Sequence, residues 1–217
     1  MMQFDQWWFP DGEIHIPRWM TKANKHVDGR LTYQYHKYEI ALGHCQQWQL
    51  AVDVGAHVGL WSYWMARDFR AVEAFEPVEL NRGCWQANMR RWSNAQLHDQ
   101  ALGTEAGGVT MCTPSKCTGW SFVHPMLGGI ATEQCTLDSF GFVGVNLLKI
   151  DCEGYEIFVL EGARATLQRD RPVVIVEQKG GETRYGRGEA EAVTFLQSLG
   201  WIVRENLGGD YICTFRR

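Results

Sequence analysis

The feature that most constrains the fold is a short apolar segment that runs into an acid and two spaced glycines. Residues 51–62 read AVDVGAHVGLWS, so an apolar run ends near Asp53, turns at Gly55 and continues into a helical pattern near Gly59. Gly55 has no Cβ and lets the backbone approach a ligand closely. The start of the following helix offers unpaired N–H groups to a carboxylate. The segment therefore predicts a strand, a tight turn and a helix that form one wall of a ligand site.

Short apolar runs and helical stretches alternate after this segment. Strands are predicted at residues 50–54, 71–75, 95–102, 145–150, 173–176, 201–204 and 211–215, and helices at 60–69, 78–92, 157–168 and 189–199. Continuous apolar strands separated by helices are typical of a parallel sheet that is covered on both faces. We therefore expect a doubly wound α/β fold. Residues 103–137 are expected to form short antiparallel additions or loops, and residues 178–188 a mobile loop that could cover a site.

The chain of 217 residues has room for one such domain with an appendage, since domains average about 150 residues. Residues 1–45 are predicted to form an irregular arm and a cap helix at 30–43 that stops at Gly43, and residues 46–217 the ligand-binding domain. The arm is rich in aromatic residues. We favour packing of these aromatics on the core or across a homodimer contact. The alternative is a sugar-binding surface, in which the sugar face stacks on Trp7, Trp8 and Trp19 and the cavity is lined by Tyr33, Tyr35 and His36.

Charge and cysteine content exclude several classes of protein. The formal net charge is −4, so the broad basic face with which proteins grip nucleic acid is not expected. The seven cysteines are odd in number and form no C-x-x-C pair, which favours reduced, structural thiols. The sequence has neither a basic N-terminal region followed by an apolar stretch nor an apolar run of about 20 residues. We therefore expect a cytoplasmic protein without a membrane partner.

A second acid follows at the position where a nucleoside-binding fold needs one. Glu76 ends the apolar run of residues 72–77, VEAFEP, and lies 23 residues after Asp53, a spacing that suits hydrogen bonds to two ribose hydroxyls. The dinucleotide pattern G-x-G-x-x-G and the phosphate loop G-x-x-x-x-G-K-[ST] are both missing. Asp53 would repel phosphates but suits an ammonium group. Together the two acids favour S-adenosylmethionine, which carries a ribose and an ammonium but no phosphate.

A third motif completes a resemblance. Residues 147–156 read LLKIDCEGYE, and the chain also contains ALG at 101–103, TLD at 136–138, VE at 176–177 and LGW at 199–201, in this order. Taken together, these motifs over residues 37–215 resemble the FkbM family of methyltransferases. The resemblance implies a Rossmann-like class I sheet of seven strands in the order 3-2-1-4-5-7-6, with the last strand antiparallel, that binds S-adenosylmethionine. Short chains of this kind resemble bacteriophage-encoded members.

The resemblance also implies a set of cofactor-binding residues. The methionine portion would be held by Asp53, Gly55 and Gly59 together with the turn residue Ala56. The ribose would be bound by Glu76 and Pro77, and the adenine would lie beside Gln100 and Ala101. His57 stands where the family commonly has asparagine. We favour packing or an indirect contact for its ring, with direct contact to cofactor or substrate as the alternatives.

The expected chemistry is O-methylation of a hydroxyl on a sugar, a glycan or a related small molecule. Asp151 and Glu153, at the end of the fourth strand, are the candidate catalytic residues, because a nearby base speeds removal of the hydroxyl proton by roughly 10²–10⁴-fold. Asp151 could equally bind the cofactor by stabilising its sulfonium or ammonium, and Glu153 could cap the next helix. No resident metal is assigned, but Glu177 could join these two acids around magnesium. Methylation of a base amine is disfavoured because DCEG at 151–154 replaces an N-P-P-Y-like motif. An NAD-dependent nucleotide-sugar oxidoreductase or epimerase and a non-catalytic cofactor-binding module remain as alternatives.

Overall fold

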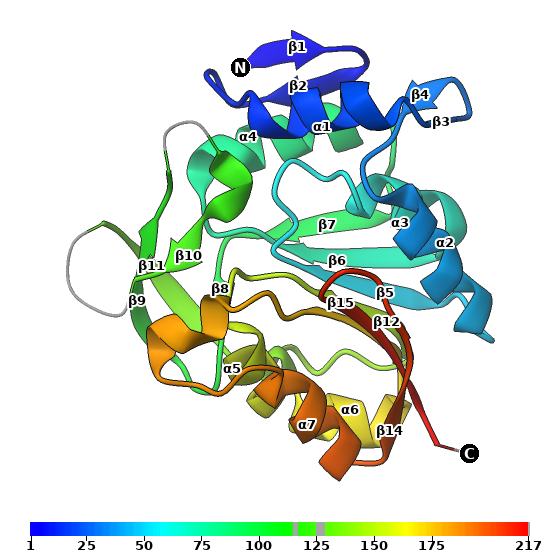
Figure 1. Cartoon of the computed structure of the whole chain (residues 1–217), viewed down its shortest axis with the longest axis vertical. Helices are drawn as coiled ribbons and strands as arrows, with labels where there is room; N and C mark the ends of the chain where they lie inside the picture. Colours follow the sequence, from blue (N-terminus) through cyan, green and yellow to red (C-terminus); the bar gives the residue numbers. More distant parts are fainter. Residues whose placement is uncertain (115–116, 125–128, 217) are drawn as a thin grey trace.

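The computed structural model describes residues 1–114, 117–124 and 129–216, and its centre is a seven-stranded sheet (Figure 1). The order across the sheet is β7-β6-β5-β12-β13-β15-β14. These strands are β5 (Leu50–Val54), β6 (Ala71–Phe75), β7 (Ala95–His98), β12 (Val145–Ile150), β13 (Val173–Glu177), β14 (Trp201–Asn206) and β15 (Asp210–Phe215). Strand β15 runs antiparallel to both of its neighbours, while the remaining pairs are parallel. The predicted strand order and the antiparallel last strand are confirmed.

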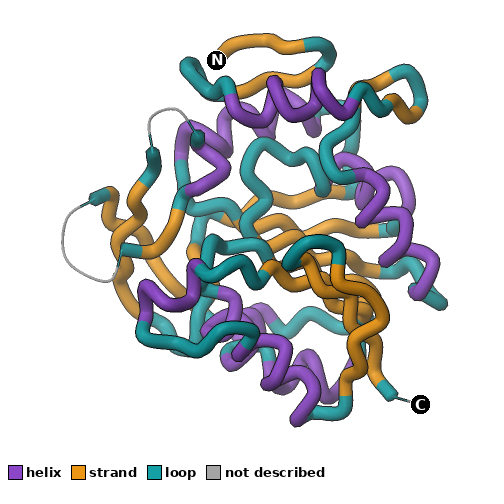
Figure 2. Tube along the Cα trace, viewed as in Figure 1, coloured by secondary structure: helices purple, strands orange, loops and turns teal. Residues whose placement is uncertain are grey.

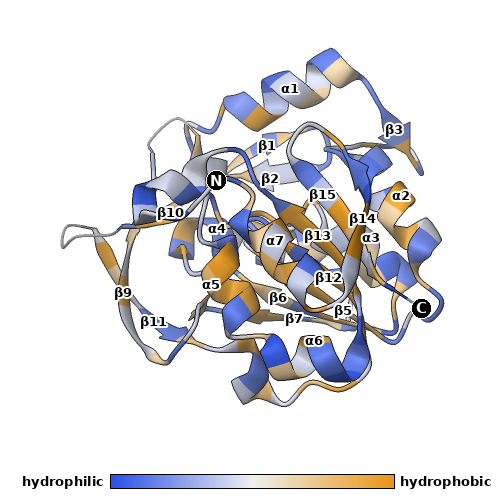
Figure 3. Cartoon of the chain, turned by 60° about the horizontal axis from the view of Figure 1, so that its bottom comes forward, coloured by the Kyte–Doolittle hydropathy of each residue, from blue (hydrophilic) through white to orange (hydrophobic). Residues whose placement is uncertain are grey.

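Helices cover both faces of this sheet, as expected from the continuous apolar strands (Figure 2). One face packs against α2 (Tyr35–His44), α3 (Ser62–Asp68) and α4 (Glu79–Met89), and the other against α5 (Glu156–Glu161), α6 (Arg164–Asp170) and α7 (Glu191–Ser198). Successive residues of a strand point to opposite faces. In β12, Leu147 accordingly joins the first core cluster and Leu148 the second. The hydropathy colouring shows the same arrangement, with predominantly hydrophobic strands between amphipathic helices (Figure 3).

The predicted strand at residues 95–102 is wrong in extent, because the chain leaves the main sheet after β7. Residues 101–102 instead form β8 (Ala101–Leu102) in a separate four-stranded sheet of order β10-β9-β11-β8. Its other strands are β9 (Gly107–Cys112), β10 (Phe122–Val123) and β11 (Ile130–Cys135). The polar residues Asp99 and Gln100 interrupt the apolar run and mark the exit. The antiparallel additions expected in this region are present at β9, β10 and β11, whereas residues 115–116 and 125–128 lie outside the described residues.

Two helix predictions also need correction. The single helix expected at 157–168 is two helices, α5 and α6, with Gly162 between them. A Cβ atom on Gly162 would lie 2.0 Å from the carbonyl oxygen of Gly103, so this break lets the backbone pack closely. The helix expected at 30–43 begins later, because Arg30–Leu31 forms strand β4 and pairs with β3 (His26–Val27). Gly43 lies inside α2 and does not end it.

The N-terminal segment is more regular than the arm that was predicted. Strands β1 (Met2–Phe4) and β2 (Trp7–Phe9) form a hairpin, and α1 (His15–Ala23) follows it. Trp7 is fully buried in the core cluster that lies between the sheet and α2, α3 and α4, and its indole N–H donates to the Leu31 carbonyl at 2.7 Å. Trp7 therefore packs the segment on the core. The boundary at residue 45 stays a prediction. No helix of the described residues is long and apolar enough to span a membrane.

Candidate active site

The carboxyl ends of β5 and β12 meet so closely that one position between them must be glycine. Lys149 pairs with Asp53 and Ile150 with Val54 in the parallel ladder. A Cβ atom on Gly55 would lie 1.9 Å from the backbone oxygen of Asp151, and Gly55 has a φ of +73°. Glycine alone tolerates both the approach and the left-handed backbone. The predicted turn therefore brings the first and third sequence motifs together at the edge of the sheet where ligands bind in open α/β folds.

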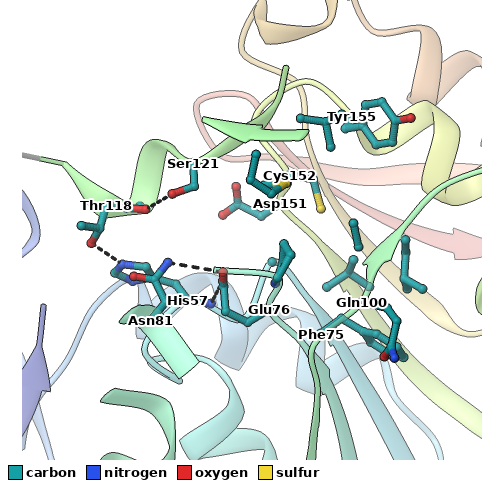
Figure 4. A pocket seen from close by; sticks show the side chains of 18 residues that line it. His57, Phe75, Glu76, Asn81, Gln100, Thr118, Ser121, Asp151, Cys152 and Tyr155 are labelled. Atoms are coloured by element: carbon teal, nitrogen blue, oxygen red, sulfur yellow. Dashed lines mark hydrogen bonds between the residues drawn. The ribbon is translucent and has the colours of Figure 1, made fainter. Parts of the chain in front are cut away.

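A first cavity of about 540 Å³ opens beside this turn (Figure 4). Predicted site residues line it from several elements: Gly55, His57, Glu76, Pro77, Gln100, Ala101 and Asp151. Apolar side chains from β6, β8, β9 and β10 supply much of the remaining wall: Phe75, Leu102, Met111 and Val123. A cavity with apolar walls and a few fixed polar groups is suited to an adenosine-like ligand.

Glu76 is the most tightly held polar group of the first cavity. It is 4% exposed, and burial raises the pKa of its carboxyl. One carboxylate oxygen accepts from the backbone N–H of His57 at 2.7 Å, and the other accepts from the backbone N–H of Val78 at 2.8 Å and the Asn81 amide at 3.4 Å. Each oxygen of an ionised carboxylate has about two acceptor sites. Glu76 is thus fixed in place, and the oxygen that accepts from His57 still has one acceptor site for a ligand hydroxyl.

His57 follows Gly55 in the turn and lines the first cavity. Its φ is +52°, a left-handed conformation that histidine adopts more readily than most residues. Burial lowers the pKa of its ring to about 4, so the ring is neutral near pH 7. Its Nε2 lies 2.8 Å from the hydroxyl oxygen of Thr118, in the short helical turn Thr118–Trp120 (Figure 4). Thr118 was missed by the sequence analysis, because nothing in its local pattern points to a partner 61 residues away.

Two of the predicted cofactor residues, Asp53 and Gly59, line neither this cavity nor the second one described below. Asp53 is fully buried, accepts from the Ser62 hydroxyl at 2.6 Å and forms an ion pair with Lys149 at 3.1 Å. A Cβ atom on Gly59 would lie 2.9 Å from the Trp85 ring, so glycine here allows α4 to pack against the turn. Direct contact of either residue with a cofactor stays a prediction.

Lys149 belongs to the site, although the sequence analysis gave it no role. Its ammonium donates to the backbone oxygen of Gly55 at 2.9 Å and lies 3.9 Å from the Asp151 carboxylate. Burial disfavours its charged form, but Asp53 and Asp151 outweigh burial and raise its pKa. The signal was present in the sequence, because a lysine inside an apolar strand such as VNLLKI at 145–150 is rarely buried without a partner.

A second and larger cavity, of about 1350 Å³, adjoins the first and shares Gly55, His57, Gly119 and Asp151 with it. The predicted cofactor residue Ala56 lines this cavity. The N-terminal segment and α2 contribute Trp19, Tyr33 and Lys37, and the Thr118–Trp120 turn contributes Trp120. Of the aromatic and histidine residues proposed for a sugar-binding surface, Trp19 and Tyr33 line the cavity, whereas Trp7, Trp8, Tyr35 and His36 do not.

Three carboxylates gather at the strand-end side of the second cavity. An oxygen from each of Asp151, Glu153 and Glu177 lies within 4.8 Å of the other two. Burial, together with the charge of Asp151, raises the pKa of Glu153 to about 8 and that of Glu177 to about 9. The Lys179 ammonium pairs with Glu177 and also lies 3.0 Å from Asp210. The two predicted catalytic acids are therefore brought together with the acid that had been considered only as a metal ligand.

The loop that carries Glu153 is held in an unusual conformation by Glu156. One oxygen of the buried Glu156 carboxylate accepts from the backbone N–H groups of Cys152 at 2.8 Å and Gly154 at 2.9 Å. Glu153 and Gly154 both have positive φ, and a Cβ atom on Gly154 would lie 2.2 Å from the backbone of Gly181. The glycine-rich loop expected at 178–188 therefore packs on this turn. Glu156 acts as the anchor of the third motif, a role that sequence analysis did not assign.

The lining of the first cavity fits a ligand without phosphates. Among its described residues are two acids, Glu76 and Asp151, but no lysine or arginine. A dinucleotide would bring a pyrophosphate beside these acids with no cation in the lining to offset its charge, whereas S-adenosylmethionine brings a ribose, an ammonium and a sulfonium. The residues present fit S-adenosylmethionine better than NAD, which disfavours the oxidoreductase alternative.

Solved structures share this fold at low sequence identity. Methyltransferase FkbM from Methylobacillus flagellatus aligns with a TM-score of 0.54 and 18% identity, over 78% of this chain and 44% of that chain. This chain thus spans less than half of the Methylobacillus protein. A precorrin-6y C5,15-methyltransferase from Geobacter metallireducens has a TM-score of 0.51 and 13% identity, over 88% and 93% of the two chains. A Streptococcus mutans protein assigned as a methyltransferase was solved with S-adenosylhomocysteine. It aligns with a TM-score of 0.53 and 11% identity, over 84% of this chain and 97% of that chain.

Sequence comparison identifies the family. A comparison with curated protein sequences gives no match. The family model described as the methyltransferase FkbM domain matches residues 53–203, which is more than half of the chain. The match begins at Asp53 within the first motif and contains the second and third motifs. The chain therefore belongs to the FkbM family of S-adenosylmethionine-dependent methyltransferases.

Proposed function

We propose that this protein transfers a methyl group to a hydroxyl of a sugar, a glycan or a related small molecule, with the cofactor in the first cavity and the acceptor in the second. The family supports the methyl transfer. The observation that carries the choice of a hydroxyl is the carboxylate cluster of Asp151, Glu153 and Glu177, which lines the cavity next to the cofactor cavity. A hydroxyl must lose a proton when it is methylated, and a carboxylate can accept that proton.

The raised pKa values of the cluster suit this task. A general base is most effective when its pKa lies near the working pH, and the pKa of Glu153 is raised to about 8. S-adenosylmethionine supplies a methyl group that is already activated by a positive sulfur. As the hydroxyl oxygen bonds to the methyl carbon, the carbon–sulfur bond breaks and leaves a thioether, and the carboxylate takes the hydroxyl proton. The residues of both cavities must hold the reacting atoms about 3–3.5 Å apart and keep water away.

Proton transfer explains the cluster better than a resident magnesium ion does. The ammonium of Lys179 already pairs with Glu177, so a cation is present on the acid that a metal would need. Asp210, which faces Glu177 across the β13–β15 ladder, pairs with a further cation, Lys37, at 2.5 Å. We therefore expect methyl transfer to survive EDTA treatment. Loss of activity in EDTA that magnesium restores would instead make the three carboxylates a metal site.

The walls of the second cavity support a sugar as acceptor. Trp19 and Trp120 are 38% and 53% exposed, and Trp19 is braced edge-on by Tyr33 at a ring distance of 5.0 Å. Exposed aromatic rings offer an apolar face for the C–H groups of a sugar, and the carboxylates of the same cavity offer acceptors for its hydroxyls. The net charge of −4 gives little attraction for a nucleic acid acceptor.

The experiment is transfer of a labelled methyl group from S-adenosylmethionine to monosaccharide, oligosaccharide and glycan-extract acceptors, followed by mass spectrometry of the product. We expect label on a hydroxyl oxygen. Label on nitrogen, or transfer to nucleic acid alone, would contradict the proposal. Calorimetry with S-adenosylhomocysteine and NAD runs beside it, and binding of S-adenosylhomocysteine without transfer to any acceptor would indicate a non-catalytic binding module.

A further inference from the structure

A chain of hydrogen bonds links the N-terminal segment to the cofactor turn. It begins at Glu13, which is fully buried and precedes the part of the chain that matches the family model. It passes through Thr118 and ends on the ring of His57, a residue that lines both cavities. The three residues come from three separate segments, so this contact forms only in the folded chain.

Both carboxylate oxygens of Glu13 accept hydrogen bonds from donors of the chain. One of its carboxylate oxygens accepts from the backbone N–H groups of His15 at 2.8 Å and Ile16 at 3.1 Å. The other accepts from the backbone N–H of Thr118 at 2.6 Å and from the Thr118 hydroxyl at 2.9 Å. A carboxylate in this setting acts as an acceptor on both oxygens. The hydroxyl proton of Thr118 is therefore directed at Glu13.

This arrangement decides which nitrogen of His57 carries the proton. A hydroxyl has one proton to donate, and Thr118 gives it to Glu13. The 2.8 Å contact between Thr118 and Nε2 must then be a hydrogen bond in which Nε2–H donates to the hydroxyl oxygen. Because burial lowers the pKa of the ring to about 4, His57 is neutral near pH 7 and holds a single ring proton. Nδ1 is consequently left with a free lone pair.

The free lone pair is available to a ligand. Nδ1 of His57 has no hydrogen-bond partner within the described residues. It is also not one of the polar atoms that are both fully enclosed and without a partner, and the His57 ring lines both cavities. We propose that Glu13, acting through Thr118 as a positioning residue, fixes His57 with its proton on Nε2, so that Nδ1 accepts a hydrogen bond from a ligand donor at the junction of the two cavities.

Two ligand groups could donate a hydrogen bond to Nδ1: the ammonium of the cofactor and a hydroxyl of the acceptor. The assignment of the cavities rests on the proposed function, whereas the position of the proton on His57 does not. The N-terminal segment, which lies outside the family match, would in this way complete the site that the family domain begins.

Nitrogen NMR of the histidine rings in the unmodified protein tests the position of the proton directly, without any acceptor substrate. We expect Nε2 of His57 to be protonated and Nδ1 to be bare near pH 7, with the resonance assigned by comparison with His57→Asn. A proton on Nδ1 would overturn the inference. This measurement decides the matter even if the variants below do not fold, and it stands apart from any failure to detect methyl transfer.

Matched variants of Thr118 test the consequence for binding. Thr118→Ser keeps the hydroxyl, and Thr118→Val removes it with little change in shape. We expect Thr118→Val and Glu13→Gln to weaken the ligand contact about 10-fold, and Thr118→Ser to retain it, with similar melting temperatures for the two Thr118 variants.

Measurements with different ligands identify which group donates to Nδ1 of His57. A weaker affinity of Thr118→Val for S-adenosylhomocysteine but not for methylthioadenosine, which lacks the amino acid, assigns the ammonium of the cofactor. A higher KM for the acceptor with unchanged cofactor affinity assigns the acceptor hydroxyl. Equal behaviour of Thr118→Val and Thr118→Ser in both arms would overturn the proposed role of the hydrogen-bond chain.

Discussion

The two cavities share four lining residues, but the surroundings of their carboxylates differ. In the first, Glu76 has three donors around it and is fixed before any ligand arrives. In the second, Asp151, Glu153 and Glu177 crowd together, and the pKa values of Glu153 and Glu177 are raised to about 8 and about 9. The difference teaches that donors can make a carboxylate rigid, whereas crowding by other acids raises the pKa of a carboxylate and suits it to accept a proton.

The largest effect is expected where the second cavity loses its proton acceptor. Glu153→Gln keeps the shape of the side chain but cannot take a proton, so kcat should fall by roughly 10²–10⁴-fold while the affinity for S-adenosylhomocysteine stays unchanged. Steady-state kinetics and calorimetry measure the two quantities. Glu205→Gln, at an exposed position on β14, is the matched control. An unchanged kcat together with weaker cofactor binding would merge the two cavities into one binding site.

The pH profile sharpens the same comparison. Because Glu153 and Glu177 bind protons up to about pH 8 and pH 9 in the free protein, the basic form of the cluster grows as the pH rises. We expect kcat/KM to increase through this range and to level off above it, since kcat/KM reports the groups of the free enzyme. A value of kcat/KM that does not change between about pH 6 and pH 9 would show that the carboxylate cluster takes no part in proton transfer.

A smaller effect is expected from a change in the first cavity, and it should appear as a loss of affinity for the cofactor. Glu76→Gln places an NH₂ group against one of the two backbone N–H donors, from His57 and Val78. A charge-assisted hydrogen bond is worth roughly 1.5–3 kcal/mol, so the dissociation constant for S-adenosylhomocysteine should rise by about 10²-fold. Glu73→Gln, on the same strand but paired with His98, is the control and should bind normally. Normal binding by Glu76→Gln would move the cofactor out of the first cavity.

The sequence predicted the sheet and most of the first cavity, because both depend on local patterns. Apolar runs marked β5, β6 and β12 at their observed bounds, and an acid at a strand end identified Glu76 and Asp151. The carboxyl ends of neighbouring parallel strands meet at one edge, so residues far apart in sequence could be placed together. Asp53 lies on its predicted strand, but the local pattern did not report that its side chain accepts a hydrogen bond from Ser62 and pairs with Lys149.

The second cavity was only partly predictable, because it depends on contacts across long sequence separations. The turn that carries Trp120 into this cavity is held through Thr118, which lies 105 residues from Glu13 and 61 from His57, and no periodicity reports such a contact. The aromatic residues of the N-terminal segment looked alike in sequence, yet Trp7 is buried in the core and Trp19 faces the cavity. Which aromatic faces the cavity is decided by how the hairpin and α1 pack, and the sequence pattern contains no record of that packing.

A modest effect is expected from the aromatic wall of the second cavity. Trp19→Ala removes an exposed ring that is braced by Tyr33, and an aromatic contact contributes about 0.5–1.5 kcal/mol, so the KM for a sugar acceptor should rise about 2- to 10-fold. The affinity for S-adenosylhomocysteine should not change. Trp48→Ala, an exposed tryptophan that does not line either cavity, should alter neither value. Equal effects of the two variants would argue against a binding role for this wall.

The smallest effect is expected in stability, and it has a defined sign. Glu153 and Glu177 have raised pKa values in the folded protein, so between about pH 4.5 and about pH 8–9 the folded chain holds protons that the unfolded chain releases. Their contribution is complete at the acidic end of this window, and the free energy of unfolding falls as the pH rises through it. Scanning calorimetry from about pH 5 to about pH 9 should therefore show a declining melting temperature.

The double variant Glu153→Gln, Glu177→Gln should reduce this decline by a few degrees, since about 1 kcal/mol corresponds to roughly 2–4 °C for a chain of this size. A residual slope is expected because burial also raises the pKa of Glu156, to about 7. Glu205→Gln should leave the slope unchanged. If the double variant keeps the full slope, the crowding of the three acids does not disfavour their charged forms, and the contrast between the rigid carboxylate of one cavity and the proton-accepting carboxylates of the other loses its physical basis.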